Sequence, residues 1–332
     1  MNSKMLGQQR TGSCLHTPCS SRQRWQTNMQ LPSRLQAEVT SSSGSSSSSR
    51  SPVLILPGFL SNNTTSATSQ YRELADNLLQ LGHPAAEILP ASTWDWLPTL
   101  SGGSFGWYVE RLAEAVQRLQ AKHQRQISLV GISAGGWLAR LALGSEPYAG
   151  KVWGLAPSVH TLVTCGTPHH SFEAYPFGRA EETWLVDQPQ DAQMEAAALQ
   201  EASTRSSSSS SSRITTSLQY ANHHYPDASS LQPTRIVCVI GSAVTGKRVE
   251  LAEVLKLRMS VADANYAWFV QSSYQANCGQ VEVDGDGVCP VQTGLLPGAE
   301  QLVLPGVWHN AEPGKLWYGS QQVVQLWDSF LP

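Results

Sequence analysis

The sequence ISLVGISAGGWLAR at residues 127–140 carries more information about the fold than any other part of the chain. Residues 127–130 are an apolar run typical of a buried strand, and residues 137–143 have the composition of a helix. Between them, GISAG at 131–135 is the Gly-X-Ser-X-Gly pattern in a strand–turn–helix setting. The small flanking residues allow a sharp, strained turn that lifts the Ser133 hydroxyl clear of the sheet. We therefore predict that Ser133 is a nucleophile.

A second stretch, GGSFG at residues 102–106, fits the same five-residue pattern around Ser104. Pro98 precedes it and interrupts any strand, and the surrounding residues form a glycine-rich loop. We interpret Ser104 as a loop residue, so the context of the pattern selects Ser133.

Composition limits the classes of protein to consider. The 332 residues suffice for one large α/β domain, and 41% hydrophobic residues suffice for a substantial core. A formal net charge of −3 gives no reason to expect nucleic acid as a partner, and no apolar run is long enough to span a bilayer. Cysteine and histidine spacings predict no metal site, and we expect no cofactor. Cys278 and Cys289 flank an acidic loop, where spacing alone leaves a disulfide open.

The N-terminal segment has the composition of a targeting sequence. Residues 1–37 contain five Lys and Arg residues, many Ser, Thr and Gln residues, and no Asp or Glu. This is typical of an organelle transit peptide, and a disordered basic tail is the alternative. Residues 38–51 are rich in serine and are expected to form a flexible linker.

From residue 52 onward, apolar strand-like runs alternate with helical periods. We expect strands at 52–56, 85–89, 127–130, 161–165, 235–240 and 301–304, with helices at 71–81, 107–122, 137–143 and 320–330. This alternation predicts an α/β fold, with a mostly parallel sheet covered on both faces. Residues 168–234 lose the period and are expected to form a cap or lid inserted in the 52–332 domain, with a disordered serine tract at 205–213.

A serine nucleophile needs a base, and the base needs a group that orients it. In this fold the acid follows the serine, and the histidine comes last. The loop DGDGV at 284–288 offers Asp286, with Asp284 as the competitor. His309 follows the last predicted strand and is the only histidine beyond that loop. We predict a Ser133–Asp286–His309 triad.

Other residues are assigned to the oxyanion hole and the substrate pocket. The oxyanion donors are expected to be the amides of Ala134 and Phe59, with Leu60 as the alternative to Phe59 and as a substrate contact. His169 and His170 are expected near the pocket rim, where His169 contacts substrate. Trp94, Trp96 and the aromatic residues of 172–177 are candidates to line an acyl site, with core packing as the alternative for each.

With these residues placed, the chain resembles the α/β-hydrolase superfamily, in particular its lipase-like branch, through GTPH at 166–169. It resembles more closely a mostly uncharacterised family of α/β-hydrolases from plants, algae and cyanobacteria. That resemblance covers residues 52–332 and is carried by PGFL at 57–60, WDW at 94–96, SAGGW at 133–137, GDG at 285–287 and WYG at 317–319. Ile132 stands where lipases more often have histidine. The resemblance implies a plant or algal source and agrees with a chloroplast presequence.

Together these features predict a serine esterase or lipase, acting through an acyl-enzyme on a carboxylic ester with an apolar acyl chain. A plastid glycerolipid is the candidate substrate that the location suggests. Such a lipid substrate would bring peripheral contact with a membrane and no transmembrane segment. A thioesterase or acyltransferase with the same triad is the main alternative. A non-catalytic binding protein on the same fold is a further alternative, although such proteins usually lack a triad member.

Overall fold

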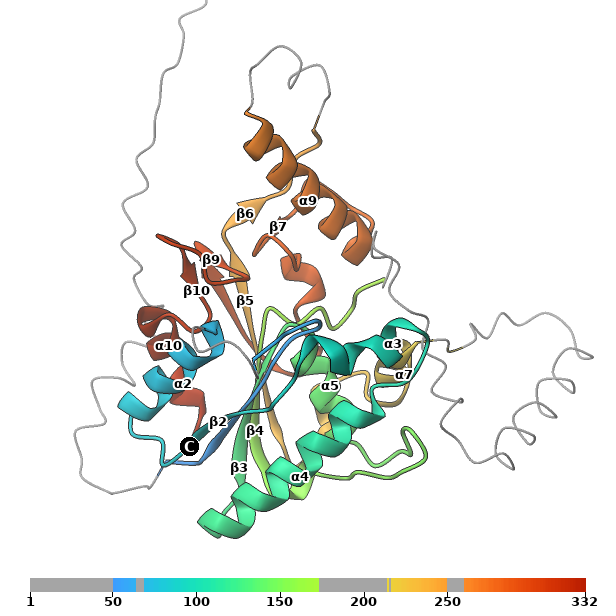
Figure 1. The fold of residues 1–332 in the computed structure, drawn as a ribbon, viewed down its shortest axis with the longest axis vertical. Coiled ribbons are helices and arrows are strands. Elements are labelled where there is room, and N and C mark those ends of the chain that lie inside the picture. The colour runs from blue at the N-terminus through green and yellow to red at the C-terminus, as the bar shows by residue number, and fades with distance from the viewer. Residues whose placement is uncertain (1–49, 64–68, 173–213, 215, 250–259) are drawn as a thin grey trace, which may run out of the picture. The chain divides into compact units, whose positions relative to one another are not determined.

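A six-stranded parallel sheet runs through the centre of the structure, which is a computed structural model (Figure 1). The strand order is β2-β1-β3-β4-β5-β8, and every neighbouring pair is parallel. Parallel neighbours require crossover connections, and helices make several of these connections here. The predicted α/β fold with a parallel central sheet is confirmed.

The structure describes residues 50–63, 69–172, 214, 216–249 and 260–332. All of them fall in the compact unit Ser48–Pro332. The predicted transit peptide at 1–37, nearly all of the linker at 38–51 and the serine tract at 205–213 lie outside the described residues. Of the predicted cap at 168–234, only residues 168–172, 214 and 216–234 are described.

Six strands build the central sheet, and four shorter strands form two separate pairs. The sheet strands are β1 (Val53–Leu56), β2 (Ala86–Ile88), β3 (Ile127–Ile132), β4 (Val159–Cys165), β5 (Arg235–Ser242) and β8 (Glu300–Pro305). The short pairs are β6 (Val244–Thr245) with β7 (Asp284–Gly285), and β9 (Val307–Trp308) with β10 (Leu316–Trp317). Each predicted strand is present within a few residues of its expected bounds.

The described α-helices are α2 (Gln70–Gln80), α3 (Leu97–Leu100), α4 (Gly106–His123), α5 (Ala134–Leu143), α7 (Ser217–His224), α9 (Val261–Cys278) and α10 (Gln321–Trp327). Short 3-10 turns are η1 (Thr93–Trp96), η2 (Ala156–Ser158), η4 (Ala228–Leu231), η5 (Val291–Thr293) and η6 (Asp328–Phe330). Helices α2 and α10 lie on one side of the sheet, α4 and α5 lie on the other, and α9 lies beyond the carboxyl ends of the strands (Figure 1). None of the described helices is long and apolar enough to cross a bilayer.

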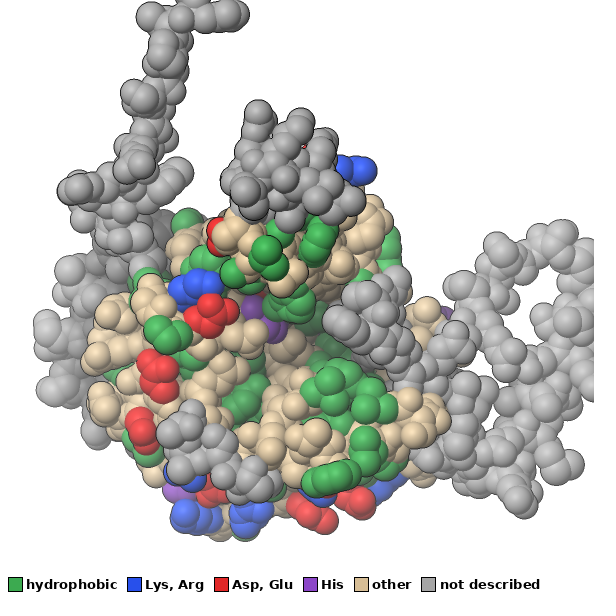
Figure 2. All heavy atoms as spheres, turned by 45° about the horizontal axis from the view of Figure 1, so that its top comes forward, with side chains coloured by type: hydrophobic (Ala, Val, Ile, Leu, Met, Phe, Trp, Pro, Cys, Tyr) green, Lys and Arg blue, Asp and Glu red, His purple; other side chains and the backbone are tan. Residues whose placement is uncertain are grey.

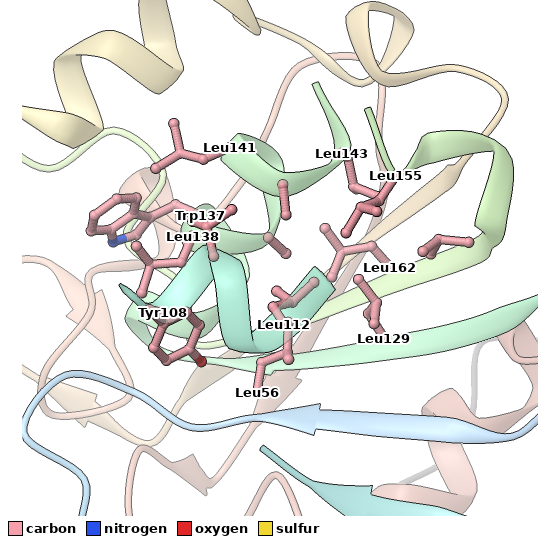
Figure 3. Packing of buried hydrophobic residues seen from close by; sticks show 14 of the residues in the cluster. Leu56, Tyr108, Leu112, Leu129, Trp137, Leu138, Leu141, Leu143, Leu155 and Leu162 are labelled. Atoms are coloured by element: carbon pink, nitrogen blue, oxygen red, sulfur yellow. The ribbon is translucent and has the colours of Figure 1, made fainter. Parts of the chain in front are cut away.

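Two hydrophobic cores cover the two faces of the sheet. Along β1, Leu54 and Leu56 point into the core under α4 and α5, which Figure 3 shows from close by. Val53 and Ile55 point into the other core, under α2 and α10. Successive side chains of a strand point to opposite faces, so a strand buried on both sides must be apolar throughout. This explains the unbroken apolar runs that predicted the sheet.

A buried arginine joins α5 to α7. Arg140 is completely buried, and its guanidinium donates to the carbonyl oxygens of Ala221 and Tyr225 and, over 3.0 Å, to Asn222 Oδ1. Burial lowers the pKa of Arg140 to about 10, so the side chain remains a cation at neutral pH. The planar fork of a guanidinium satisfies several acceptors at once, and α7 is thereby fixed against the helix that follows Ser133.

We expect Arg140→Lys to lower the free energy of unfolding by about 2–4 kcal/mol, because one ammonium cannot reach all of these buried acceptors. Urea denaturation followed by circular dichroism measures this change. Arg118→Lys is the matched control, because Arg118 makes an exposed ion pair with Glu87 and should lose less than about 0.5 kcal/mol. Equal losses in the two variants would contradict this role of Arg140.

Candidate active site

Ser133 occupies a strained turn between β3 and α5. Its backbone has φ 53° and ψ −127°, in a region that residues with a side chain rarely adopt. The Ser133 amide donates to the carbonyl oxygen of Cys165 over 2.9 Å, and Thr167 Oγ1 donates to the carbonyl oxygen of Ser133 over 2.7 Å. Such strain persists only where the surroundings fix it. The last residue of β4 and the loop that follows it therefore hold this strained turn in place.

Glycines make this turn sterically feasible. A Cβ at Gly131 would lie 2.5 Å from the Cα of Gly136, and a Cβ at Gly135 would lie 2.3 Å from the carbonyl oxygen of Leu56. A Cβ at Gly58, in the loop after β1, would lie 2.8 Å from Ser133 Cβ and 3.4 Å from Ser133 Oγ. The loop after β1 therefore approaches the serine side chain so closely that position 58 has no room for a side chain.

His309 and Asp286 form a buried pair. His309 Nδ1 lies 2.7 Å from Asp286 Oδ2, and the His309 amide donates to the Asp286 carbonyl oxygen over 2.9 Å. A carboxylate only accepts, so Nδ1 is the donor in this bond, and Nε2 is left for another partner. Asp286 is 1% exposed and His309 is 7% exposed. Both side-chain and backbone bonds thus fix the imidazole orientation that a general base needs.

The acid loop positions Asp286 and excludes Asp284 from this pair. Asp286 Oδ1 accepts from the amides of Val288 and Cys289 over 2.9 and 2.6 Å. Asp284 is exposed and accepts from Thr245 Oγ1 over 2.5 Å. Of the two acids left open by the sequence, the structure places Asp286 against His309.

Cys278 and Cys289, whose spacing left a disulfide open, carry free thiols.

Ser133 and the His309–Asp286 pair lie at the same edge of the sheet. Ser133 follows β3, and its amide is bonded to the last residue of the neighbouring strand β4. The next residue along the chain, Gly166, leaves so little space that a Cβ there would be 2.7 Å from Asp286 Oδ2. No hydrogen bond within the described ranges joins Ser133 Oγ to His309. In enzymes without substrate such bonds are often long, and they tighten when substrate binds.

Backbone donors are available beside the serine. Ala134 opens α5, where the first amides of a helix lack intrahelical partners and the helix dipole favours negative charge. In the part of the chain that the structure describes, the amides of Ala134, Phe59 and Leu60 donate no hydrogen bond. Leu60 adopts φ 59°, and the Gly58 amide donates to the hydroxyl of Tyr71 over 3.2 Å. These unused donors flank the Ser133 turn from two sides.

The prediction that His169 lies at the pocket rim and contacts substrate is wrong. His169 is completely buried; Arg140 Nη1 lies 3.4 Å from its Nδ1, and Thr164 Oγ1 lies 3.2 Å from its Nε2. Burial and the neighbouring Arg140 cation hold the pKa of His169 well below its usual value. His169 is a neutral core residue that helps to satisfy Arg140, whereas His170 is partly exposed.

The predicted aromatic residues separate into two groups. Trp96 is completely buried, and its ring packs edge-on against Phe59 at 5.2 Å, so core packing explains it. Trp94 is 78% exposed and lines a surface cavity of about 600 Å³ together with Trp107 and Arg111. Leu60 is half-exposed and Phe172 is exposed, while residues 173–177 lie outside the described ranges.

Figure 2 shows a hollow in the face at the carboxyl ends of the strands, with a histidine side chain visible in it and hydrophobic side chains on either side. A small cavity of about 20 Å³ beside the buried pair is lined by residues that include Phe269, Trp308, Asp286 and His309. No group of three or more His, Cys, Asp and Glu side chains that could hold a metal ion occurs among the described residues.

Sequence reasoning missed Tyr318, which donates from its hydroxyl to Asp286 Oδ2 over 2.6 Å. Burial and the Asp286 charge raise the pKa of Tyr318 well above its usual value, so the phenol stays protonated. Tyr318 belongs to WYG at 317–319, a motif noted for its resemblance alone. Its role depends on a contact between segments 32 residues apart, for which the local sequence carries no signal.

The sequence matches no protein-family model and no curated protein. Among solved structures, the chain is similar to the mature form of the lipase BlEst2 of Bacillus licheniformis, with 15% identity over 86% of this chain and 92% of that chain and a TM-score of 0.48. It is also similar to EstA from Clostridium botulinum, with 15% identity over 85% and 87% of the two chains and a TM-score of 0.44. A lipase/esterase from Lactobacillus plantarum has 13% identity over 85% and 88%, with a TM-score of 0.37.

We expect Gly58→Ala to lower kcat/KM for an ester by about 100-fold, because the added methyl group displaces either the Ser133 turn or the loop that approaches it. Steady-state kinetics measures this loss. Gly154→Ala is the control: Gly154 has φ 57° and open space around its Cβ position, so the substitution should cost about 1 kcal/mol of stability and leave kcat/KM unchanged. Unchanged kinetics in Gly58→Ala would contradict this close approach.

His169 should make the folded state sensitive to acid. Because its pKa is held low by burial, the folded state leaves His169 neutral while the unfolded state binds a proton near pH 6.5. Stability should therefore be complete above pH 6.5 and fall as the pH drops, by about 2 kcal/mol between pH 6.5 and 5. Urea unfolding over this range, compared with His169→Gln, measures the contribution. Parallel pH dependences in the two proteins would count against it.

Proposed function

We propose that this protein is a serine hydrolase that cleaves carboxylic esters through an acyl-enzyme. The observation that supports it most strongly is the buried His309–Asp286 pair, 2.7 Å between Nδ1 and Oδ2, at the same sheet edge as the strained Ser133 turn. A nucleophile, a base with a free nitrogen and an acid that orients the base are the parts that acyl transfer needs.

In the proposed reaction, Ser133 Oγ attacks the ester carbonyl carbon while His309 Nε2 takes the hydroxyl proton. The carbonyl oxygen becomes an oxyanion held by the amides of Ala134 and of Phe59 or Leu60. His309 then gives its proton to the departing alkoxide, so an alcohol leaves and the acyl group stays on Ser133. Water repeats the sequence on the acyl-enzyme, releasing the carboxylic acid and restoring the serine. Asp286 stabilises the imidazolium in both halves.

An ester with an apolar acyl group fits the surface around this site. Leu60 follows the loop that approaches Ser133 and is 48% exposed, and Phe269 lines the small cavity beside His309 and is 45% exposed. Apolar side chains left in water near a site favour apolar ligands. We include in the proposal a lipid ester reached by peripheral contact. We also include a location in an organelle, which the basic, acid-free segment 1–37 favours, and the chloroplast is the organelle that the family resemblance implies.

A fluorophosphonate probe with peptide mapping tests this proposal, together with hydrolysis of p-nitrophenyl esters of increasing chain length by the full chain. We expect the label on Ser133, and we expect Ser133→Ala to abolish labelling and to lower kcat by at least about 10⁴-fold with the fold intact. Because the chain carries a second match to the motif, Ser104→Ala is the matched control and should keep both labelling and turnover.

Each assay should be run with and without detergent micelles, which supply a lipid-like interface. A folded protein that neither labels nor turns over in either condition would contradict the proposal. Labelling that survives in Ser133→Ala would contradict the assignment of the nucleophile. Faster turnover of matched thioesters than of esters would move the proposal to a thioesterase with the same triad.

A further inference from the structure

Asp286 Oδ2 accepts two hydrogen bonds. His309 Nδ1 lies 2.7 Å from this oxygen, and the Tyr318 hydroxyl lies 2.6 Å from it. The other carboxylate oxygen is already bonded to two backbone amides of its own loop. The phenol and the imidazole therefore share one oxygen of the acid.

The direction of the Tyr318 bond follows from its second partner. The Gly241 amide, at the end of β5, lies 2.8 Å from the Tyr318 hydroxyl and can only donate to it. The hydroxyl proton is thus left for the carboxylate, which only accepts. A hydroxyl that accepts from one side is polarised and donates more strongly on the other. The chain of bonds runs from Gly241 through Tyr318 to Asp286.

Space for this contact is built into the strand ends. Gly166 has φ 59°, and a Cβ there would lie 2.7 Å from Asp286 Oδ2 and 2.9 Å from the Tyr318 hydroxyl. The rings of Tyr318 and His309 meet edge to face, with centroids 6.4 Å apart. Tyr318 is completely buried, so its hydroxyl is out of reach of bulk solvent. The phenol is held against both members of the pair.

We propose that Tyr318 is a positioning residue that sets the basicity of His309 through Asp286. This proposal deepens the proposed hydrolase function and rests on it for the reaction concerned. By donating to Oδ2, Tyr318 fixes that oxygen in line with Nδ1 and takes up part of the carboxylate charge. The protonated imidazole is then stabilised less than it would be beside a carboxylate without this donor. Removal of the Tyr318 hydroxyl should therefore strengthen the hold of the carboxylate on a protonated His309.

Other titratable groups face this cluster from three elements. They are Tyr266 and Tyr274 of α9, Cys289 of the acid loop, and Glu312 and Lys315 after His309. Tyr274 donates to the carbonyl oxygen of Val244, and Lys315 pairs with Glu312. Within the described ranges, Tyr318 is the one side chain besides His309 that bonds the Asp286 carboxylate.

Tyr318→Phe in the full chain tests the proposal. We expect the midpoint of the acid limb of the pH dependence of kcat/KM to rise by about 0.5–1 pH unit, and kcat/KM on the alkaline side to fall about 10-fold. A ¹⁵N NMR titration of the His309 ring, assigned by comparison with His309→Gln, should show the same upward shift. This second readout needs no turnover, so it tests Tyr318 even if the protein hydrolyses no ester.

Tyr148→Phe is the matched control. Tyr148 is also completely buried, and its hydroxyl accepts from the Phe105 amide over 2.9 Å, but it lies in the core on the other face of the sheet. It should lose stability without moving either titration. If a folded Tyr318→Phe leaves both the pH dependence of kcat/KM and the NMR titration unchanged, the proposal is overturned. Tyr318 would then have only a structural role.

A second variant covers the case in which Tyr318→Phe fails to fold. Site-specific 3-fluorotyrosine in place of Tyr318 keeps the size of the ring and makes the phenol a stronger donor. The titration midpoint of His309 should then move downward, opposite to the shift in Tyr318→Phe. A midpoint that stays in place, or rises, would overturn the proposal.

Discussion

The strained backbone at Ser133 is the constraint on which the rest of the site depends. A residue with a side chain at φ 53° is held there by bonds to the carbonyl oxygen of Cys165 and from the hydroxyl of Thr167, both at the end of β4. Close backbone approaches on the other side require glycine at 58, 131 and 135. The parallel pairing of β1, β3 and β4 brings these segments together at one edge. The sheet thus positions the site, because the strand pairing fixes where β1, β3 and β4 end.

The second constraint is the burial of a carboxylate. Asp286 is almost fully removed from water, and a buried charge must be hydrogen-bonded on all sides. Its donors come from its own loop, from His309 after β9 and from Tyr318 after β10. The hydrogen bonds that satisfy the buried carboxylate of Asp286 therefore also fix the orientation of the His309 imidazole. A change in any of these segments alters the hydrogen bonding of Asp286, and the position of His309 changes as a result.

Local patterns predicted the sheet, the helices that cover it and the sharp turn at Ser133, because apolar periodicity and a five-residue motif are properties of contiguous sequence. Asp286 and Asp284 stand two residues apart, and only the three-dimensional loop places the first against His309. His169 was placed at the surface because the buried cation Arg140, which it contacts, has no signal in a sequence. Helix α9 was missed because its apolar and polar residues are not segregated onto separate faces, which leaves the helical period weak.

The same helix shows why that missing period matters. Helix α9 fixes the acid loop through polar bonds: the Gly287 amide donates to Tyr274, and Ser273 and Asn277 both donate to the carbonyl oxygen of Val288. One turn before Ser273, Phe269 is partly exposed and lines the small cavity at His309, and Trp268 is partly exposed as well. A helix that only covered a core would need one apolar face. A helix that braces a polar loop and also presents aromatic rings to solvent needs polar and apolar residues interleaved, and that is the pattern α9 has.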